Sequence, residues 1–127
     1  RFRSGLIIPD ENVLWYTTET KENLFDDPEE VLKRLGDNTA VVCYNDEVAF
    51  GLVKCLLSAG RRVPEDVAVV SFDNSNLSWI SQVPITSLSY EDRNIGRIAA
   101  QKLVDILDGR DVSSEVLPWT FIQKESS

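Results

Sequence analysis

Two kinds of segment alternate along the middle of the chain: short apolar runs, and longer runs in which apolar residues recur at helical spacing. Ala40 to Tyr44 is a continuous apolar run, as expected for a strand covered on both faces in a parallel sheet. From Asp46 the spacing becomes that of an amphipathic helix, which Ala59-Gly60 would end with a left-handed stop. The apolar face of this helix is Val48, Ala49, Leu52, Val53, Leu56 and Leu57.

The same arrangement occurs a second time. After a turn around Pro64, the run from Val67 to Phe72 predicts another buried strand, which ends abruptly at the polar stretch Asp73-Asn74-Ser75. A short extended piece and a helix from Glu91 to Asp108 follow, and Gly109 ends that helix. A possible capping box runs from Ser89 to Asp92, and the apolar face is Ile95, Ile98, Ala99, Leu103, Ile106 and Leu107.

Three further elements are expected nearer the ends of the chain. Val13 to Thr18 is rich in strand-forming residues, and Val116 to Ile122 predicts a last strand, which Pro118 confines to an edge or makes irregular. A short helix is expected between them. Its signals are Asp27 as N-cap, Pro28 at the first helical position, Glu30 closing a capping box and Gly36 as the stop.

Strands and helices that alternate in this way indicate the α/β class with a mostly parallel sheet. In such sheets ligands bind beyond the carboxyl ends of the strands. Asn45 and Asp73 each stand where a predicted parallel strand ends, so both should project at the same rim. Together they form a candidate binding site.

An amide and a carboxylate side by side suit a polyol. Asn45 offers an acceptor and two donors and Asp73 offers acceptor oxygens, which together match the vicinal hydroxyls of a sugar. Aromatic rings could cover the C–H faces of such a ring. Those near the expected rim are Tyr44, Phe72, Trp79 and Tyr90.

Each of these residues also has a purely structural interpretation. Asn45 could simply cap the following helix, with Asp46 and Glu47 complementing the helix dipole. Asp73 could form an Asx-turn, and the aromatic residues could pack in the core.

Composition narrows the classes of function. The 127 residues carry a net charge of −8 and no histidine, which argues against a nucleic-acid-binding surface on this chain and against histidine-based catalysis. We expect no enzyme activity, no cofactor and no metal. A phosphoryl-accepting role for Asp73 would need an acidic pair near the first strand and a conjugate lysine, but Asp26-Asp27 precede a helix instead.

The two cysteines and the lengths of the apolar runs indicate the cellular compartment of the protein. Cys43 and Cys55 fall on a predicted strand and a predicted helix, outside any C-x-x-C spacing, and we expect buried reduced thiols and hence a cytoplasmic protein. No apolar run approaches the roughly 20 residues that span a bilayer, so no membrane contact is expected. The chain opens Arg-Phe-Arg without an initiator Met, and we expect it to be part of a longer protein.

The ordered motifs from "AVVCYNDEVAFG" through "VPEDVAVVSFDNS" and "VPITSLSYEDRNIG" to "KESS" resemble the C-terminal half of a LacI/GalR-type effector domain, which has the type I periplasmic-binding-protein-like fold. The resemblance covers about two-thirds of the chain, from Ala40 onward. "FDNS" and the Tyr before Asn45 look most like the arabinose-responsive repressors that carry a GntR-type winged helix. The matching residues are Asn45, Asp46, Ala49, Gly60, Val63, Pro64, Asp66, Val67, Phe72, Asp73, Pro84, Thr86, Gly96, Ala99, Glu125 and Ser126.

The resemblance implies a sugar effector bound in a cleft between two α/β lobes. It assigns ligand contacts to Asn45 and Asp73. It assigns a further contact to Tyr90, at a position where the family often has Gln. A last contact falls to Arg3 or Arg1, as the remnant of the Arg-x-x-Gly-Phe segment of the family. Two more departures are Ser71 for the usual Gly and Lys124 for the usual Arg.

The resemblance also implies that the domain is incomplete. Residues 1–88 and 114–127 would form the C-terminal lobe, and the helix in 89–113 would belong to an absent N-terminal lobe. A homodimer is implied, as is DNA binding through a separate N-terminal domain. The function that follows is sugar sensing, for L-arabinose, by a transcriptional repressor. The alternative is the sugar-binding component of an ABC transporter, which shares the fold.

Overall fold

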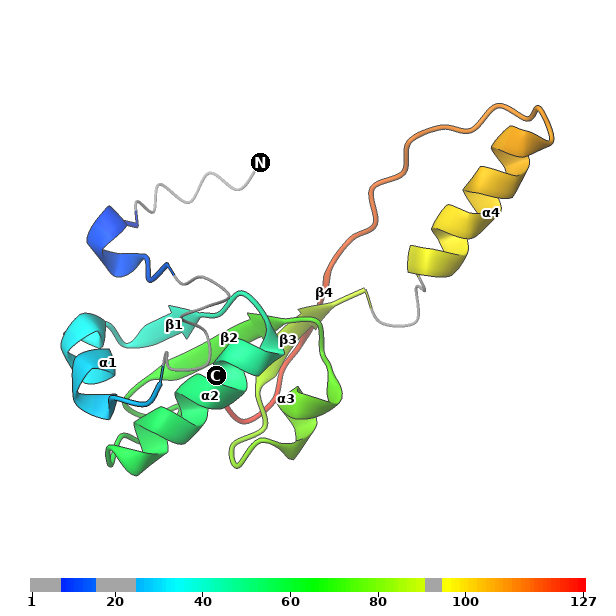
Figure 1. Cartoon of the computed structure of the whole chain (residues 1–127). Helices are drawn as coiled ribbons and strands as arrows, with labels where there is room; N and C mark the ends of the chain where they lie inside the picture. The colour runs from blue at the N-terminus through cyan, green and yellow to red at the C-terminus, as the bar shows by residue number, and fades with distance from the viewer. Residues whose placement is uncertain (1–7, 16–24, 91–94) are drawn as a thin grey trace.

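The computed structural model describes residues 8–15, 25–90 and 95–127 (Figure 1). Its elements are a 3-10 helix at Asp10–Asn12, helix α1 at Pro28–Leu35, strand β1 at Ala40–Val42, helix α2 at Asp46–Ser58, strand β2 at Ala68–Phe72, helix α3 at Asn76–Ile80, strand β3 at Thr86–Ser89, helix α4 at Ile95–Leu107 and strand β4 at Thr120–Ile122.

The strands form one sheet in the order β1-β2-β3-β4. The first three are parallel, with Val42 opposite Val70 and Phe72 opposite Leu88. β4 runs antiparallel to β3 at the edge, where Phe121 pairs with Leu88. The predicted α/β class and the edge position of the last strand are confirmed, although β4 is shorter than the predicted run from Val116. Pro118 and exposed Val116 lie outside it.

One face of the sheet carries the core. α2 lies across this face with α1 and α3 beside it (Figure 1). Burial of apolar surface between α2 and the strands is the main source of stability for such a layer. The core consists of Val31, Cys43, Val48, Ala49, Leu52, Val53, Cys55, Leu56, Val63, Val67, Val69 and Ile85.

The other face of the sheet is open in the described part of the chain. Val42, Tyr44 and Phe121 are 70%, 78% and 55% exposed. The prediction that Ala40 to Tyr44 is covered on both faces is therefore wrong. Val41 and Cys43 pack toward α2, whereas alternate residues point to the open face, because successive side chains in a strand point to opposite faces.

The helix signals after residue 27 and after residue 45 are confirmed. The Asp27 carboxylate accepts from the backbone amides of Glu29 and Glu30, and Pro28 opens α1. The Glu30 carboxylate pairs with Arg34 rather than completing a capping box. α2 ends at Ser58, followed by Gly60 with a φ of 74°.

Two further predictions, the strand from Val13 to Thr18 and the capping box from Ser89 to Asp92, are not confirmed. Val13, Leu14 and Trp15 are exposed and belong to no strand, because no neighbouring strand pairs with them in the described part of the chain. The rest of that predicted strand, to Thr18, lies outside the described residues. So do residues 91–94, which include Asp92 of the expected capping box; α4 is described from Ile95.

Helix α4 stands away from the sheet, at the end of a long extended connection to β4 (Figure 1). None of its residues is buried. Its predicted apolar face is largely open to solvent, with Leu103, Ile106 and Leu107 all exposed. No helix of the described segments is both long and apolar enough to cross a bilayer.

The last residues of the chain return to the sheet and are bonded into it. Ser126 is fully buried, where its Oγ accepts from the backbone amide of Thr86 and donates to the carbonyl of Val69. Its backbone carbonyl accepts from the amide of Val69 at 2.8 Å. Since these bonds reach both β2 and β3, they fix the C-terminal segment on two strands.

Candidate functional site

The carboxyl ends of β1, β2 and β3 lie at the same edge of the sheet, because the three strands are parallel neighbours. Asn45 follows β1, Asp73 follows β2 and Tyr90 follows β3. The topology therefore brings three of the four predicted site residues to one edge, called the carboxyl edge below. Arg3, the fourth, lies outside the described residues.

Asn45 caps α2. Its Oδ1 atom accepts a hydrogen bond from the backbone amide of Val48 at 3.0 Å, which satisfies one of the amides left free at a helix start. The structural interpretation of Asn45 is thus confirmed. The side-chain NH₂ group has no hydrogen-bond partner within the described segments and remains available to a ligand.

Asp73 and Asn74 form a left-handed turn, with φ values of 98° and 50°. Such angles are unfavourable for residues with a Cβ atom and persist only where the surroundings enforce them. Three successive backbone amides are held here. That of Asp73 donates to the carbonyl of Leu88 at 2.9 Å, that of Asn74 to Ser87 Oγ at 3.0 Å, and that of Ser75 to Asp46 Oδ2 at 2.5 Å.

The Asp73 side chain is exposed, and none of the described residues donates a hydrogen bond to its carboxylate. An Asx-turn, the structural alternative for this residue, is therefore not formed. A rigid, strained turn that presents an unpaired carboxylate is an arrangement found at ligand sites.

Asp46 has a role that the sequence analysis missed. Instead of merely facing the helix dipole, its side chain is 1% exposed and accepts from Ser71 Oγ, from Ser87 Oγ at 2.9 Å and from the amide of Ser75. Ser71, which stands where the family usually has Gly, is thus a partner of this buried carboxylate. Polar Ser71 inside the otherwise apolar run of β2 was the available signal.

An aromatic cluster lies at the same edge. The Tyr90 ring packs on Trp119 with centroids 4.0 Å apart and planes 30° apart, and Phe72 meets Trp119 edge-on at 5.4 Å. Trp119, 45% exposed, was not among the predicted aromatic residues, because it precedes β4 rather than following a parallel strand. Trp79 lies instead under the ammonium of Lys124, 4.4 Å from the ring centroid.

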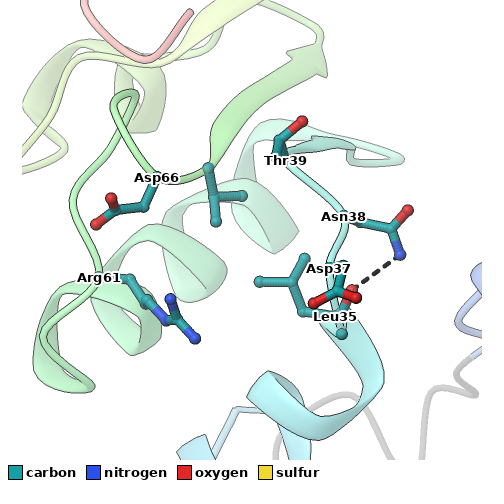
Figure 2. A pocket seen from close by; sticks show the side chains of 8 residues that line it. Leu35, Asp37, Asn38, Thr39, Arg61 and Asp66 are labelled. Carbon is teal, nitrogen blue, oxygen red and sulfur yellow. Dashed lines mark hydrogen bonds between the residues drawn. The ribbon is translucent and has the colours of Figure 1, made fainter.

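A hollow of about 180 Å³ lies at the opposite edge, where β1 and β2 begin (Figure 2). Its lining residues are Leu35, Gly36, Asp37, Asn38, Thr39, Arg61, Asp66 and Val67. Asn38 donates to the carbonyl of Leu35 at 2.8 Å, and Asp66 is held by Arg62, which lowers the pKa of its carboxyl to about 2. The side chains of Asn38 and Asp66 are thus already engaged within the protein.

Cys43 and Cys55 are buried and free, as the sequence predicts for reduced thiols. Burial, and then the neighbouring charge of Asp46, raise the pKa of the Cys43 thiol to about 12, so this group is neutral and unreactive at physiological pH. Among the described residues, no cluster of three or more His, Cys, Asp or Glu side chains could hold a metal ion.

Comparison with known families identifies the fold. Residues 5–127 match the model of the periplasmic binding protein-like domain. The chain belongs to this family. In a solved structure titled as a transcriptional regulator CelR-cellobiose complex, the same fold recurs with a TM-score of 0.78 and 32% identity, over 95% of this chain and 38% of that one.

Named relatives are transcriptional regulators rather than enzymes. The chain is 32% identical over 109 residues to the arabinose metabolism transcriptional repressor of Halalkalibacterium halodurans, which covers 82% of this chain and 28% of the relative. It is 35% identical over 78 residues to the repressor PurR of Vibrio atlanticus, over 61% of this chain and 23% of the relative. The chain thus spans about a quarter of the length of these curated relatives.

Proposed function

We propose that this chain is the C-terminal lobe of the effector-sensing domain of a transcriptional repressor, and that the effector is a small sugar. The observation that carries the proposal is the left-handed turn at Asp73 and Asn74, which holds a carboxylate without a partner among the described residues. It lies at the same carboxyl edge as Asn45, whose NH₂ group likewise has no partner in the described segments. Ligands of parallel α/β sheets bind at this edge.

The chemistry of the edge suits a pyranose. The Asp73 carboxylate accepts from two vicinal hydroxyls, and the Asn45 amide donates to a hydroxyl or ring oxygen. The cluster of Tyr90, Trp119 and Phe72 offers an apolar surface for the C–H groups of the ring. Arg3 would add a charged donor from a part of the chain that the structure does not describe.

L-arabinose is the sugar we propose. An arabinose metabolism repressor is among the sequence relatives, and a regulator in complex with cellobiose is among the structural neighbours. The sequence comparison and the structural comparison therefore both support a sugar effector. A regulator is favoured over the sugar-binding component of an ABC transporter because the named relatives are repressors.

The effector would bind between this lobe and a second one. Residues 1–88 and 114–127 form the C-terminal lobe in this proposal, and the helix in 89–113 belongs to the N-terminal lobe. The exposed apolar face of α4 supports that division, because such a face needs a partner to bury it. The protein would work in the cytoplasm as a homodimer and reach DNA through a separate N-terminal domain.

Calorimetric titration of the complete protein with L-arabinose, D-xylose, D-galactose and cellobiose tests the proposal. We expect L-arabinose to bind with a Kd in the micromolar range and to weaken binding to operator DNA in a mobility-shift assay, since an effector acts only through differential affinity for two states. Binding of cellobiose alone would keep the sugar class and overturn the choice of arabinose. No heat with any of the four sugars would overturn the ligand class.

A further inference from the structure

Lys124 is anchored on the turn that carries Asp73. Its Nζ atom donates to Asn74 Oδ1 at 2.8 Å, to Ser78 Oγ at 3.0 Å and to the carbonyl of Ile85 at 2.8 Å. An ammonium group has three N–H donors, so all of them are used.

The surroundings of the ammonium explain why it stays in place. Nζ lies 4.4 Å from the centroid of the Trp79 ring, whose face attracts a cation. Lys124 is only partly exposed, and burial lowers the pKa of its amine while the charge of Asp46 opposes that shift. Lys124 is thus a partly desolvated cation with a complete set of acceptors.

Asn74 is the link between this cation and the candidate site. Its backbone is left-handed, its amide is held by Ser87 and its side chain is held by Lys124, so the residue is fixed from two directions. Asp73, the residue before it, has the less favourable φ of the two, and such a conformation persists only where the surroundings enforce it. Its own amide donates to the carbonyl of Leu88, and Asn74 is the neighbour that follows it in the turn.

We propose that Lys124 is a positioning residue of the effector site, which fixes the orientation of the Asp73 carboxylate through Asn74. This inference rests on the proposed function, because it gives Asp73 the task of binding the effector. Lys124 itself does not touch the sugar.

A double-mutant cycle separates positioning from a general loss of stability. Lys124→Met keeps the aliphatic stem and removes the charge and the donors. In the complete protein we expect it to weaken sugar binding about tenfold, which corresponds to about 1.4 kcal/mol. In an Asp73→Asn background the same change should have no further effect. Lys54→Met, at an exposed lysine of α2, is the matched control and should leave affinity unchanged.

Lys124→Arg gives the conservative variant. The guanidinium keeps the charge over Trp79 and a donor for Asn74, although its planar geometry cannot reproduce all three bonds. We expect affinity to recover to within about threefold of the parent. Equal losses from Lys124→Met in the parent and in the Asp73→Asn background, or no loss at all, would overturn the proposal.

Amide hydrogen exchange on this chain supplies a readout that needs no sugar. In Lys124→Met the amides of Asp73 and Asn74 should exchange at least about fivefold faster, while the α2 amides of Leu52 and Val53 keep their rates. If the complete protein binds no sugar, the proposed function fails, and this exchange experiment still decides the role of Lys124. Unchanged exchange at Asn74 would overturn it.

Discussion

Asp46 Oδ2 lies 2.5 Å from the backbone nitrogen of Ser75, which joins the start of α2 to the turn after β2. Asn45 directly precedes one partner, and Asp73 lies two residues before the other. The relative placement of the two proposed sugar contacts is therefore set by the buried carboxylate of Asp46, which is not itself one of those contacts. Ser71 and Ser87 complete its hydrogen bonds from β2 and β3.

Asp46→Ala should lower the free energy of unfolding by about 3 kcal/mol. The variant leaves two hydroxyls and one amide without their charged acceptor, and each lost bond to a charged group costs about 1.5–3 kcal/mol, partly offset because the charge is no longer buried. Urea denaturation of this chain measures the change. Asp111→Ala, at an exposed carboxylate, should change stability by less than about 0.5 kcal/mol. A loss at Asp46 as small as at Asp111 would contradict the interpretation.

Two substitutions at Asn45 separate its capping role from its proposed contact with the sugar. Asn45→Asp keeps the acceptor for the Val48 amide but removes the NH₂ donors, so stability should change by less than about 0.5 kcal/mol while sugar affinity falls. Asn45→Ala should lose about 1 kcal/mol of stability and affinity together. The measurements are urea denaturation and calorimetric titration. If Asn45→Asp binds the sugar as tightly as the parent does, the Asn45 side-chain NH₂ group does not contact the sugar.

Much of the fold could be predicted because its signals are local. Asp27 and Asn45 cap helices that form where expected, Pro28 opens the first of them, and the run to Phe72 ends at the predicted rim residue Asp73. The exposed face of β1 could not be predicted, because an apolar run does not reveal whether a covering layer is present. In the same way, the β-rich composition of Val13 to Trp15 does not reveal whether a neighbouring strand is present to pair with them, and none of the described strands does.

The site could be predicted only in part. Strand ends pointed to Asn45, Asp73 and Tyr90, since parallel topology brings such positions to one edge. The bonds of Asp46 and Lys124 span sequence separations of 25 to 50 residues, and no local pattern indicates such partners. Trp119 was missed for the same reason, because its neighbours Phe72 and Tyr90 lie far from it in sequence.

Cys43 should make stability fall at alkaline pH. Its pKa is raised to about 12 in the folded chain, so between the ordinary thiol pKa of about 8.5 and 12 the folded state binds more protons than the unfolded state. The stabilisation is thus fully present below about pH 8.5 and is lost as pH rises toward 12. Urea denaturation from pH 7 to 11 should show a steeper decline for the parent chain than for Cys43→Ala. Parallel curves would contradict this assignment.

Gly51→Ala should destabilise the chain although it adds a better helix former to α2. A Cβ atom at this position would lie 2.5 Å from Cδ2 and 2.8 Å from Cε2 of Phe25, so the ring must move. Overpacking costs about 1–3 kcal/mol, against about 0.5–1 kcal/mol gained from helix propensity. In a Phe25→Ala background the same change should stabilise. Urea denaturation of the four chains tests the sign reversal, and a stabilising Gly51→Ala beside Phe25 would contradict the packing.

The central claim is that the carboxyl edge, and Asp73 in particular, binds the effector. The most direct measurement is the Kd for L-arabinose of the complete protein and of Asp73→Asn, with Asp37→Asn in the hollow at the opposite edge as control (Figure 2). We predict a loss of at least about 30-fold in Asp73→Asn, because removing one partner of a desolvated charged bond costs about 2–5 kcal/mol, and no loss in Asp37→Asn. Undiminished binding in Asp73→Asn, or a loss confined to Asp37→Asn, would contradict the account.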